Sequence, residues 1–312
     1  MGGLLATLLA GCYRPAPPPT LTPAYPTAPP APPPAAPASA ILTDGSALAG
    51  EITAAVAAKF QRWQPTYTVE IGMAGTSAGF SRLCASAVDL AHTARPIDAR
   101  EAEACAQNGV KWLEVVIGYD VLAVVASPGD VFLSCLTLDD LRAVWGEGGT
   151  ANWSAVRSGF PDLPITLISA ELDPAQARFF ADAVGGALRA DILPGGDDPA
   201  LLVAHTPGAV GYLDYGRFPV KGDPLRELTY LGIDAGAGCA SPAPGMVWRG
   251  LYGTLARPMY LYVNRSSLQR LAVSLFAGYY FSADGQALIA KAGFMPASPD
   301  RYEAALAAMG GD

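Results

Sequence analysis

The chain has 312 residues, which is enough for one large domain or two modest ones around a substantial core. Hydrophobic residues make up 51% of it and charged residues 15%, so we expect most of the chain to be globular rather than disordered. The formal net charge is −8 and no basic stripe is present, which excludes a nucleic-acid partner. The negative charge does not exclude an anionic ligand, because local dipoles decide whether a site attracts an anion.

Two segments precede the globular sequence. Residues 8–12 read Leu-Leu-Ala-Gly-Cys after a short apolar run, and this resembles a bacterial lipobox, although no Lys or Arg precedes the run. We expect residues 1–12 to be a lipoprotein-type signal segment with Cys12 as the lipidated residue; the alternative is a chance apolar N-terminus. Residues 13–40 are rich in Pro, Ala and Thr, which favours polyproline II and predicts a semi-rigid tether. A tail without a role is the alternative reading of that segment.

The globular sequence begins near Ile41 and alternates strands with helices. A short strand is followed by a helix from about Leu48, in which Ile52, Val56 and Phe60 fall on one face. The patterns that come next predict strands at 66–73 and 88–92, helices at 77–87 and 98–109, and a long β run at 112–127. This alternation indicates an α/β fold.

The second half of the chain continues the same alternation. Its patterns predict helices at 136–145, 173–186, 266–282 and 283–294, and strands at 164–169, 209–215 and 257–264. Thr137 and Asp173 are the expected N-caps of the first two of these helices. Pro174 would then occupy the first helical position, where its missing N–H is not needed by the helix.

The segment Gly75-Thr76-Ser77-Ala78-Gly79 allows two interpretations. It fits the G-x-S-x-G pattern of a hydrolase nucleophile elbow, with Ser77 as the nucleophile. It also fits a strand, a turn with hydroxyl side chains and a helix start, which together make an anion cradle. A triad would need a histidine, and of the two in the chain His92 follows too soon, whereas His205 is expected to end a helix. We therefore favour the cradle.

The remaining cysteines and histidines limit the chemistry further. Without Cys12 four cysteines remain, an even number that predicts two disulfides in an oxidising compartment and leaves three pairings open. Two isolated histidines do not make a metal site, so we expect no metal and no cofactor. No other segment is long and apolar enough to span a bilayer.

Several blocks between residues 41 and 300 occur in the order seen in periplasmic phosphate-binding proteins of ABC transporters, notably Ala-Arg-Pro-Ile at 94–97 and Pro-Gly-Ala-Val-Gly-Tyr at 207–212. The chain resembles that family, and the resemblance implies the type 2 periplasmic-binding-protein fold. In this fold two α/β lobes, each a mixed sheet flanked by helices, are joined by a hinge of two crossing strands and close on a ligand.

The resemblance also implies boundaries and disulfide pairs. It places lobe 1 at 41–123 plus 260–312 and lobe 2 at 124–259, with crossings near Val121–Ala126 and Arg257–Val263. The cysteines resemble those of the cyanobacterial branch of the family, which implies the pairs Cys84–Cys105 and Cys135–Cys239.

The family's ligand site combines helix N-terminal N–H groups, Ser and Thr hydroxyls, one Arg and often a carboxylate, all of which suit a dehydrated oxyanion. The corresponding ligand-binding positions here are Ser46, Leu48, Thr76, Ser77, Ala94 and Gln176. Leu48, Ala94 and Gln176 replace side chains that carry a hydroxyl or carboxyl group, and Leu48 would add apolar bulk. Ala170 aligns with the Arg, and Pro174 removes one N–H. Arg95 either faces the cleft or has a structural role, and Arg178 either replaces the lost Arg or is a solvated surface residue. Asp120 is expected to be a turn residue.

These observations predict a solute-binding lipoprotein on the periplasmic or cell-surface side, anchored to the membrane by its N-terminal lipid. It would capture phosphate or a related small oxyanion in an interlobe cleft for an ABC permease, without enzymatic activity and with weak or altered phosphate affinity. The alternative is a non-binding structural or accessory subunit of a membrane or envelope complex, built on the same fold.

Overall fold

The computed structural model describes residues 39–170, 174–216 and 227–310. Cys12, nearly all of the 13–40 segment and the expected N-cap Asp173 lie outside the described residues.

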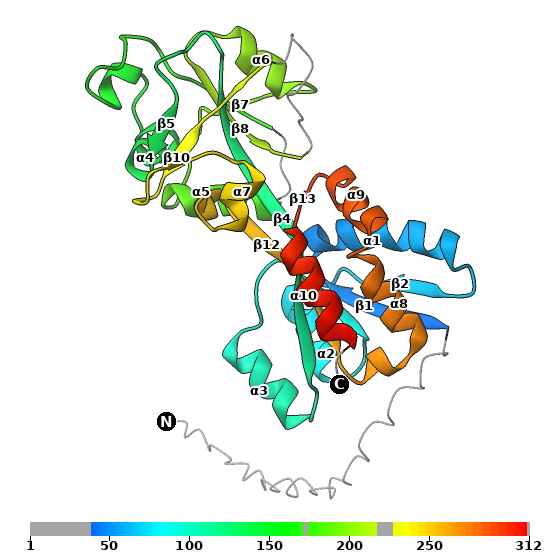
Figure 1. Ribbon diagram of the computed structural model, residues 1–312. Coiled ribbons are helices and arrows are strands. Elements are labelled where there is room, and N and C mark those ends of the chain that lie inside the picture. The colour runs from blue at the N-terminus through cyan, green and yellow to red at the C-terminus, as the bar shows by residue number, and fades with distance from the viewer. Residues whose placement is uncertain (1–38, 171–173, 217–226, 311–312) are drawn as a thin grey trace, which may run out of the picture. The chain divides into compact units, whose positions relative to one another are not determined.

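A mixed sheet of ten strands forms the centre of the fold (Figure 1). Its main order is β2-β1-β3-β12-β4-β8-β6-β7, with β13 and β9 paired to β4. The strands are β1 (Ala40–Gly45), β2 (Thr68–Ile71), β3 (Leu90–Thr93), β4 (Trp112–Ala126), β6 (Thr166–Ser169), β7 (Leu193–Pro194), β8 (Ala209–Asp214), β9 (Thr229–Tyr230), β12 (Ala256–Asn264) and β13 (Met295–Pro296). A second sheet contains β11 (Cys239–Ala240), β10 (Gly232–Asp234) and β5 (Cys135–Thr137).

Two strands, β4 and β12, connect the two parts of the central sheet. The first part of β4, from Trp112 to Val121, pairs with β12, and Leu122–Ala126 pair with β8. β12 also pairs with β3, so it lies in the sheet between β3 and β4. Both strands cover the predicted crossings, and the predicted α/β class is confirmed. The lobe limits at 123/124 and 259/260 stay a prediction.

Ten helices are described: α1 (Ala47–Trp63), α2 (Thr76–Cys84), α3 (Ala99–Gln107), α4 (Leu138–Trp145), α5 (Pro174–Val184), α6 (Pro199–His205), α7 (Pro244–Trp248), α8 (Leu271–Tyr279), α9 (Ala283–Lys291) and α10 (Pro299–Gly310). Thr137 caps α4 as predicted, through a capping box with Asp140. His205 is the last residue of α6, also as predicted. α10 was not predicted. None of the described helices is long and apolar enough to cross a membrane.

The hydrophobic residues gather in two large clusters. In the first, the α1 face of Ile52, Val56 and Phe60 is fully buried and packs with α8 and with the first part of the sheet. In the second, Trp145 of α4 and Phe180 of α5 pack with the second part of the sheet. Aromatic contacts fix both, because Phe60 and Phe276 meet edge to face at 5.1 Å, as do Trp145 and Phe180 at 5.6 Å.

Two disulfides are present, with the pairs that the resemblance implies. Cys84–Cys105 joins α2 to α3, and Cys135–Cys239 joins the outer strands of the small sheet. The first disulfide is buried and lies beside the start of β4.

Candidate functional site

The polar groups of the candidate site lie at two edges of the central sheet. β1 is parallel to both β2 and β3, so the carboxyl ends of all three meet at one edge, where α1 and α2 begin. β6 is parallel to β8, and their carboxyl ends meet near the start of α5. In open α/β sheets ligands bind outside the carboxyl ends of the strands. We call these the α1/α2 edge and the α5 edge.

At the α1/α2 edge, Ser46 is the N-cap of α1. Its N–H donates to the carbonyl of His92 at 2.8 Å, and its Oγ accepts weakly from the Ala49 N–H at 3.5 Å. The N–H groups of Ala47 and Leu48, the first two helical residues, have no acceptor within the helix. α1 therefore offers backbone donors at this edge.

Leu48 lies at the predicted position, but its side chain points into the core. It is 2% exposed and belongs to the cluster that contains Ile52 and Phe60. Leu48 thus offers no hydroxyl at this position, and its apolar side chain, which was expected to lie at the site, packs in the core instead.

Asp44, which the sequence analysis did not single out, ties two turns of this edge together. Its Oδ1 accepts from the N–H groups of Gly45 at 2.7 Å and Ala74 at 2.9 Å, and its Oδ2 accepts from Arg82 at 2.6 Å. Burial by itself would raise the pKa of Asp44, but these hydrogen bonds hold the pKa below its ordinary value. An ionised Asp44 thus joins the turn before α1 to the turn before α2.

α2 presents the best-preserved part of the predicted site. Its N-cap is Gly75, which has no side chain to satisfy the first amides, so Thr76, Ser77 and Ala78 keep N–H groups without an intrahelical acceptor. Thr76 is half-buried and Ser77 is exposed. The helix dipole favours an anion at this point.

The glycines of the G-x-S-x-G pattern have a packing explanation. A Cβ at Gly79 would lie 2.8 Å from Cα of Gly45 and 2.9 Å from the carbonyl oxygen of Asp44. Gly79 therefore allows α2 to approach β1 closely, and Gly75 adopts a φ of +103° that favours glycine. Packing and backbone conformation therefore explain both glycines without a nucleophile at Ser77.

Arg95 is held by a carboxylate on its own side of the edge. Its guanidinium makes paired bonds to Glu101 at 2.7 and 2.8 Å, which raise the pKa of Arg95, and Nη2 also donates to Ser77 Oγ at 2.9 Å. Glu101 therefore balances the charge, and the described partner of Ser77 is a cation rather than a base. Ala94, beside Arg95, is half-buried against apolar residues and supplies no hydroxyl.

His92 lies inside the α1/α2 edge. It is fully buried, its Nδ1 lies 3.0 Å from Thr43 Oγ1, and its Nε2 has no hydrogen-bond partner among the described residues. Burial lowers the pKa of His92 to about 4, so the ring is neutral at neutral pH.

At the α5 edge, Gln176 faces inward. It is 1% exposed, and its Nε2 donates to Asp120 Oδ1 at 2.8 Å and to Asp214 Oδ2 at 2.9 Å. Gln176 thus donates to two buried carboxyl groups, one in the middle of β4 and one at the end of β8. Arg178, two residues later, is exposed on α5.

Arg257 completes this cluster from β12. Its Nε donates to Asp120 Oδ2 at 2.9 Å, and its guanidinium carbon lies 4.6 Å from the ring centroid of Phe179 on α5. Burial raises the pKa of Asp120, and Arg257 and Gln176 offset this only in part. Asp120 was expected to be a turn residue and is instead the centre of a buried polar cluster.

Asp44, His92, Asp120, Asp214 and Arg257 were thus missed as site residues. One signal could have indicated Arg257, because Ala-Arg-Pro occurs at 94–96 and again at 256–258. Asp214 and Gln176 are 38 residues apart, and no local pattern connects them.

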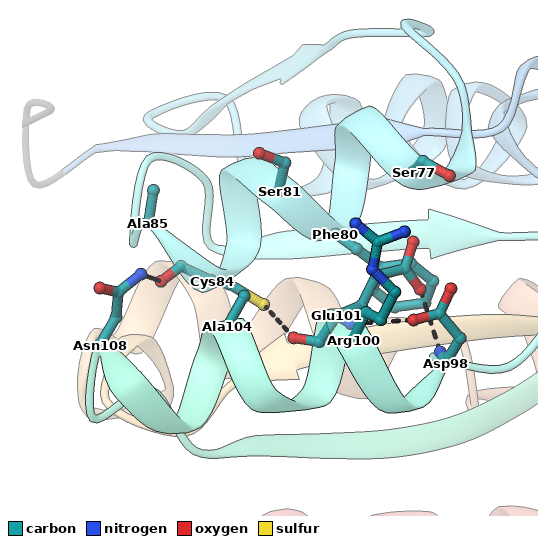
Figure 2. Close-up of a pocket in the computed structure, with 10 residues that line it drawn as sticks. All are labelled: Ser77, Phe80, Ser81, Cys84, Ala85, Asp98, Arg100, Glu101, Ala104 and Asn108. Atoms are coloured by element: carbon teal, nitrogen blue, oxygen red, sulfur yellow. Dashed lines mark hydrogen bonds between the residues drawn. The ribbon is translucent and has the colours of Figure 1, made fainter.

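A groove of about 500 Å³ lies between α2 and α3 (Figure 2). Ser77 and Asp98 line one end of it and Asn108 the other, with Arg100 and Glu101 among the other lining residues. The carboxylates of Asp98 and Glu101, of which Glu101 is paired with Arg95, make the groove an unsuitable anion site. Within the described ranges no group of His, Cys, Asp or Glu residues could hold a metal ion.

Comparison with known proteins agrees with the fold. The sequence matches the family model described as PBP superfamily domain over residues 30–282. Protein SphX of Synechocystis sp. is 30% identical over 271 residues, which are 84% of this chain and 80% of that protein. The phosphate-binding protein PstS of Staphylococcus haemolyticus is 27% identical over 228 residues, 72% of this chain and 71% of that protein. The crystal structure of a possible phosphate binding protein from Planctomyces limnophilus, 28% identical, gives a TM-score of 0.74 and covers 87% of this chain and 99% of that one.

Proposed function

Because the chain belongs to the PBP superfamily, we propose that it is an extracytoplasmic solute-binding protein that captures phosphate, or a related small oxyanion, for an ABC permease. The observation that carries this proposal is the α1/α2 edge. There the N-termini of two helices present unpaired N–H groups together with Ser46, Thr76 and Ser77, and the buried Asp44 fixes the two turns in one arrangement. The names of the similar proteins support phosphate as the ligand.

We expect the affinity for phosphate to be low. Leu48, Ala94 and Gln176 supply none of the side-chain donors or acceptors that the resemblance assigns to their positions, and Pro174 has no N–H. A hydrogen bond to a charged group contributes about 1.5–3 kcal/mol. The loss of three such bonds at the lower figure would weaken binding by roughly three orders of magnitude relative to a complete site.

The α5 edge favours a second candidate function. Its buried carboxyl groups are joined by Gln176 rather than left open for a ligand, which suits a fold retained as a non-binding subunit of an envelope complex. In that case co-purification from detergent-solubilised membranes would recover a partner, and no anion would bind.

Isothermal titration with inorganic phosphate up to millimolar concentration tests the first function, with sulfate as the comparison anion. We expect saturable binding of phosphate, and the absence of heat at millimolar phosphate would overturn the phosphate assignment. The lipid anchor is a separate proposal: labelling with a radioactive or clickable fatty acid should be lost in a Cys12→Ser variant.

A further inference from the structure

Arg257 has an unusual environment for a structural arginine. Its side chain is 19% exposed and contacts the 1%-exposed Asp120 through Nε alone. Nη2 is buried and has no hydrogen-bond partner among the described residues. An unsatisfied buried donor on a cation is costly, so such a group calls for an explanation.

The place of Arg257 in the fold points to a ligand. It is paired in register with Asp120 of β4, and Asp120 binds Gln176 in the first turn of α5. The guanidinium stacks on Phe179, one turn along the same helix. It therefore lies beside the start of α5, where the helix dipole favours an anion.

The described carboxyl groups around Arg257 already accept other hydrogen bonds. Asp120 Oδ1 is taken by Gln176, and Asp214 accepts from Gln176 and from the N–H of Gly216. The planar guanidinium has five donors in a fixed fork, which suits a tetrahedral oxyanion better than a single carboxylate oxygen. With Nε fixed on Asp120, Nη2 is the guanidinium nitrogen that lacks a hydrogen-bond partner among the described residues and could donate to a further acceptor.

We propose that Arg257, supplied by the crossing strand β12, is the arginine that contacts the bound oxyanion at the α5 edge, in place of the arginine absent at Ala170. This inference rests on the proposed function and deepens it by naming a binding residue. The ligand would then directly contact β12, one of the two strands that connect the parts of the sheet.

Phosphate titrations of four proteins test the assignment: wild type, Arg257→Gln, the double variant Arg257→Gln with Asp120→Asn, and Arg249→Gln. Arg249 is an exposed arginine after α7, so its variant is the matched control. We expect Kd to rise at least about 10-fold in both Arg257 variants and to stay unchanged in Arg249→Gln. Because the double variant leaves no unpaired carboxylate, a purely structural role predicts that it recovers wild-type affinity.

The outcomes separate the two proposals. Wild-type affinity in either Arg257 variant would overturn the role of Arg257 and leave the phosphate assignment standing. A wild-type protein that binds no phosphate would overturn both. If the Arg257→Gln variants do not fold, the arginine Nε–H spectrum of the 15N-labelled wild type decides: we expect the Arg257 signal, assigned with Arg257→Lys, to shift on phosphate addition, and no shift would overturn the contact.

Discussion

Replacing Thr76 by proline removes one backbone donor from the α1/α2 edge and leaves the helix in place. Thr76 is the first residue of α2, where proline is best tolerated. Gly75 has a ψ of 158°, which lies outside the α region that a following proline disfavours, and as a glycine it tolerates its φ of +103°. The intrahelical bond from the Gly79 N–H to the Gly75 carbonyl is kept. The variant should therefore fold and lack only the N–H and hydroxyl of residue 76.

The expected loss follows from the charge of the acceptor. A hydrogen bond to a charged group contributes about 1.5–3 kcal/mol, which corresponds to about 10- to 150-fold in Kd. Thr76→Val is the matched control, because it loses the hydroxyl and keeps the N–H. We expect Thr76→Pro to bind phosphate more weakly than Thr76→Val by this factor in isothermal titration, with thermal unfolding as the check of folding. Equal Kd values for the two folded variants would refute the assignment of the α2 amide as a ligand donor.

Three further predictions concern packing and titration. Gly79→Ala should lower the free energy of unfolding by about 1–3 kcal/mol in urea, because its Cβ would lie 2.8 Å from Gly45 Cα; a change within about 0.5 kcal/mol would contradict that close approach. The pKa of His92 falls from 6.5 unfolded to about 4 folded, so the unfolded state binds the extra proton between these values. Wild-type stability should therefore fall as pH drops from 6.5 to 4, and His92→Leu should lack that component in urea titrations; parallel pH profiles would argue against it. Because the pKa of Asp120 is raised, its protonation as pH falls should free the charge of Arg257. The ratio of the phosphate affinity of wild type to that of Asp120→Asn, in which residue 120 is always neutral, should therefore rise as pH falls. A constant ratio of the two Kd values would count against this coupling.

The elements with a strong pattern were predicted well. The apolar face of α1, the capping residue Thr137 and the long β run that became β4 follow from periodicity and capping chemistry, which act within a few residues. Strands of two or three residues, such as β7 and β11, exist only through their partners, so no local pattern could indicate them. α10 combines small residues with few large apolar ones, and this gives a weak helical pattern.

The candidate site was predicted unevenly for a related reason. The hydroxyls and helix starts of the α1/α2 edge are contiguous in sequence and were identified, whereas Asp44 acts through groups 30 and 38 residues away. The side chain of Leu48 was placed at the site because the resemblance aligns positions and does not give side-chain directions. Gln176 was treated as a lost donor, but its partners Asp120 and Asp214 come from other strands, and only the folded arrangement shows where its donors go.

The two edges therefore use their polar groups differently, and this bears on how a ligand would be held. At the α1/α2 edge, Asp44 and Glu101 accept from Arg82 and Arg95, and Asp44 also accepts from turn N–H groups, so the amides at the start of α2 are left for an anion. At the α5 edge the Gln176 amide is consumed inside the fold, and the donor without a described partner is a nitrogen of Arg257. An oxyanion that contacts both edges would combine fixed dipoles from one edge with a full charge from the other. Since that charge is carried by β12, a strand that runs from one part of the sheet to the other, ligand contact and strand position would be energetically coupled.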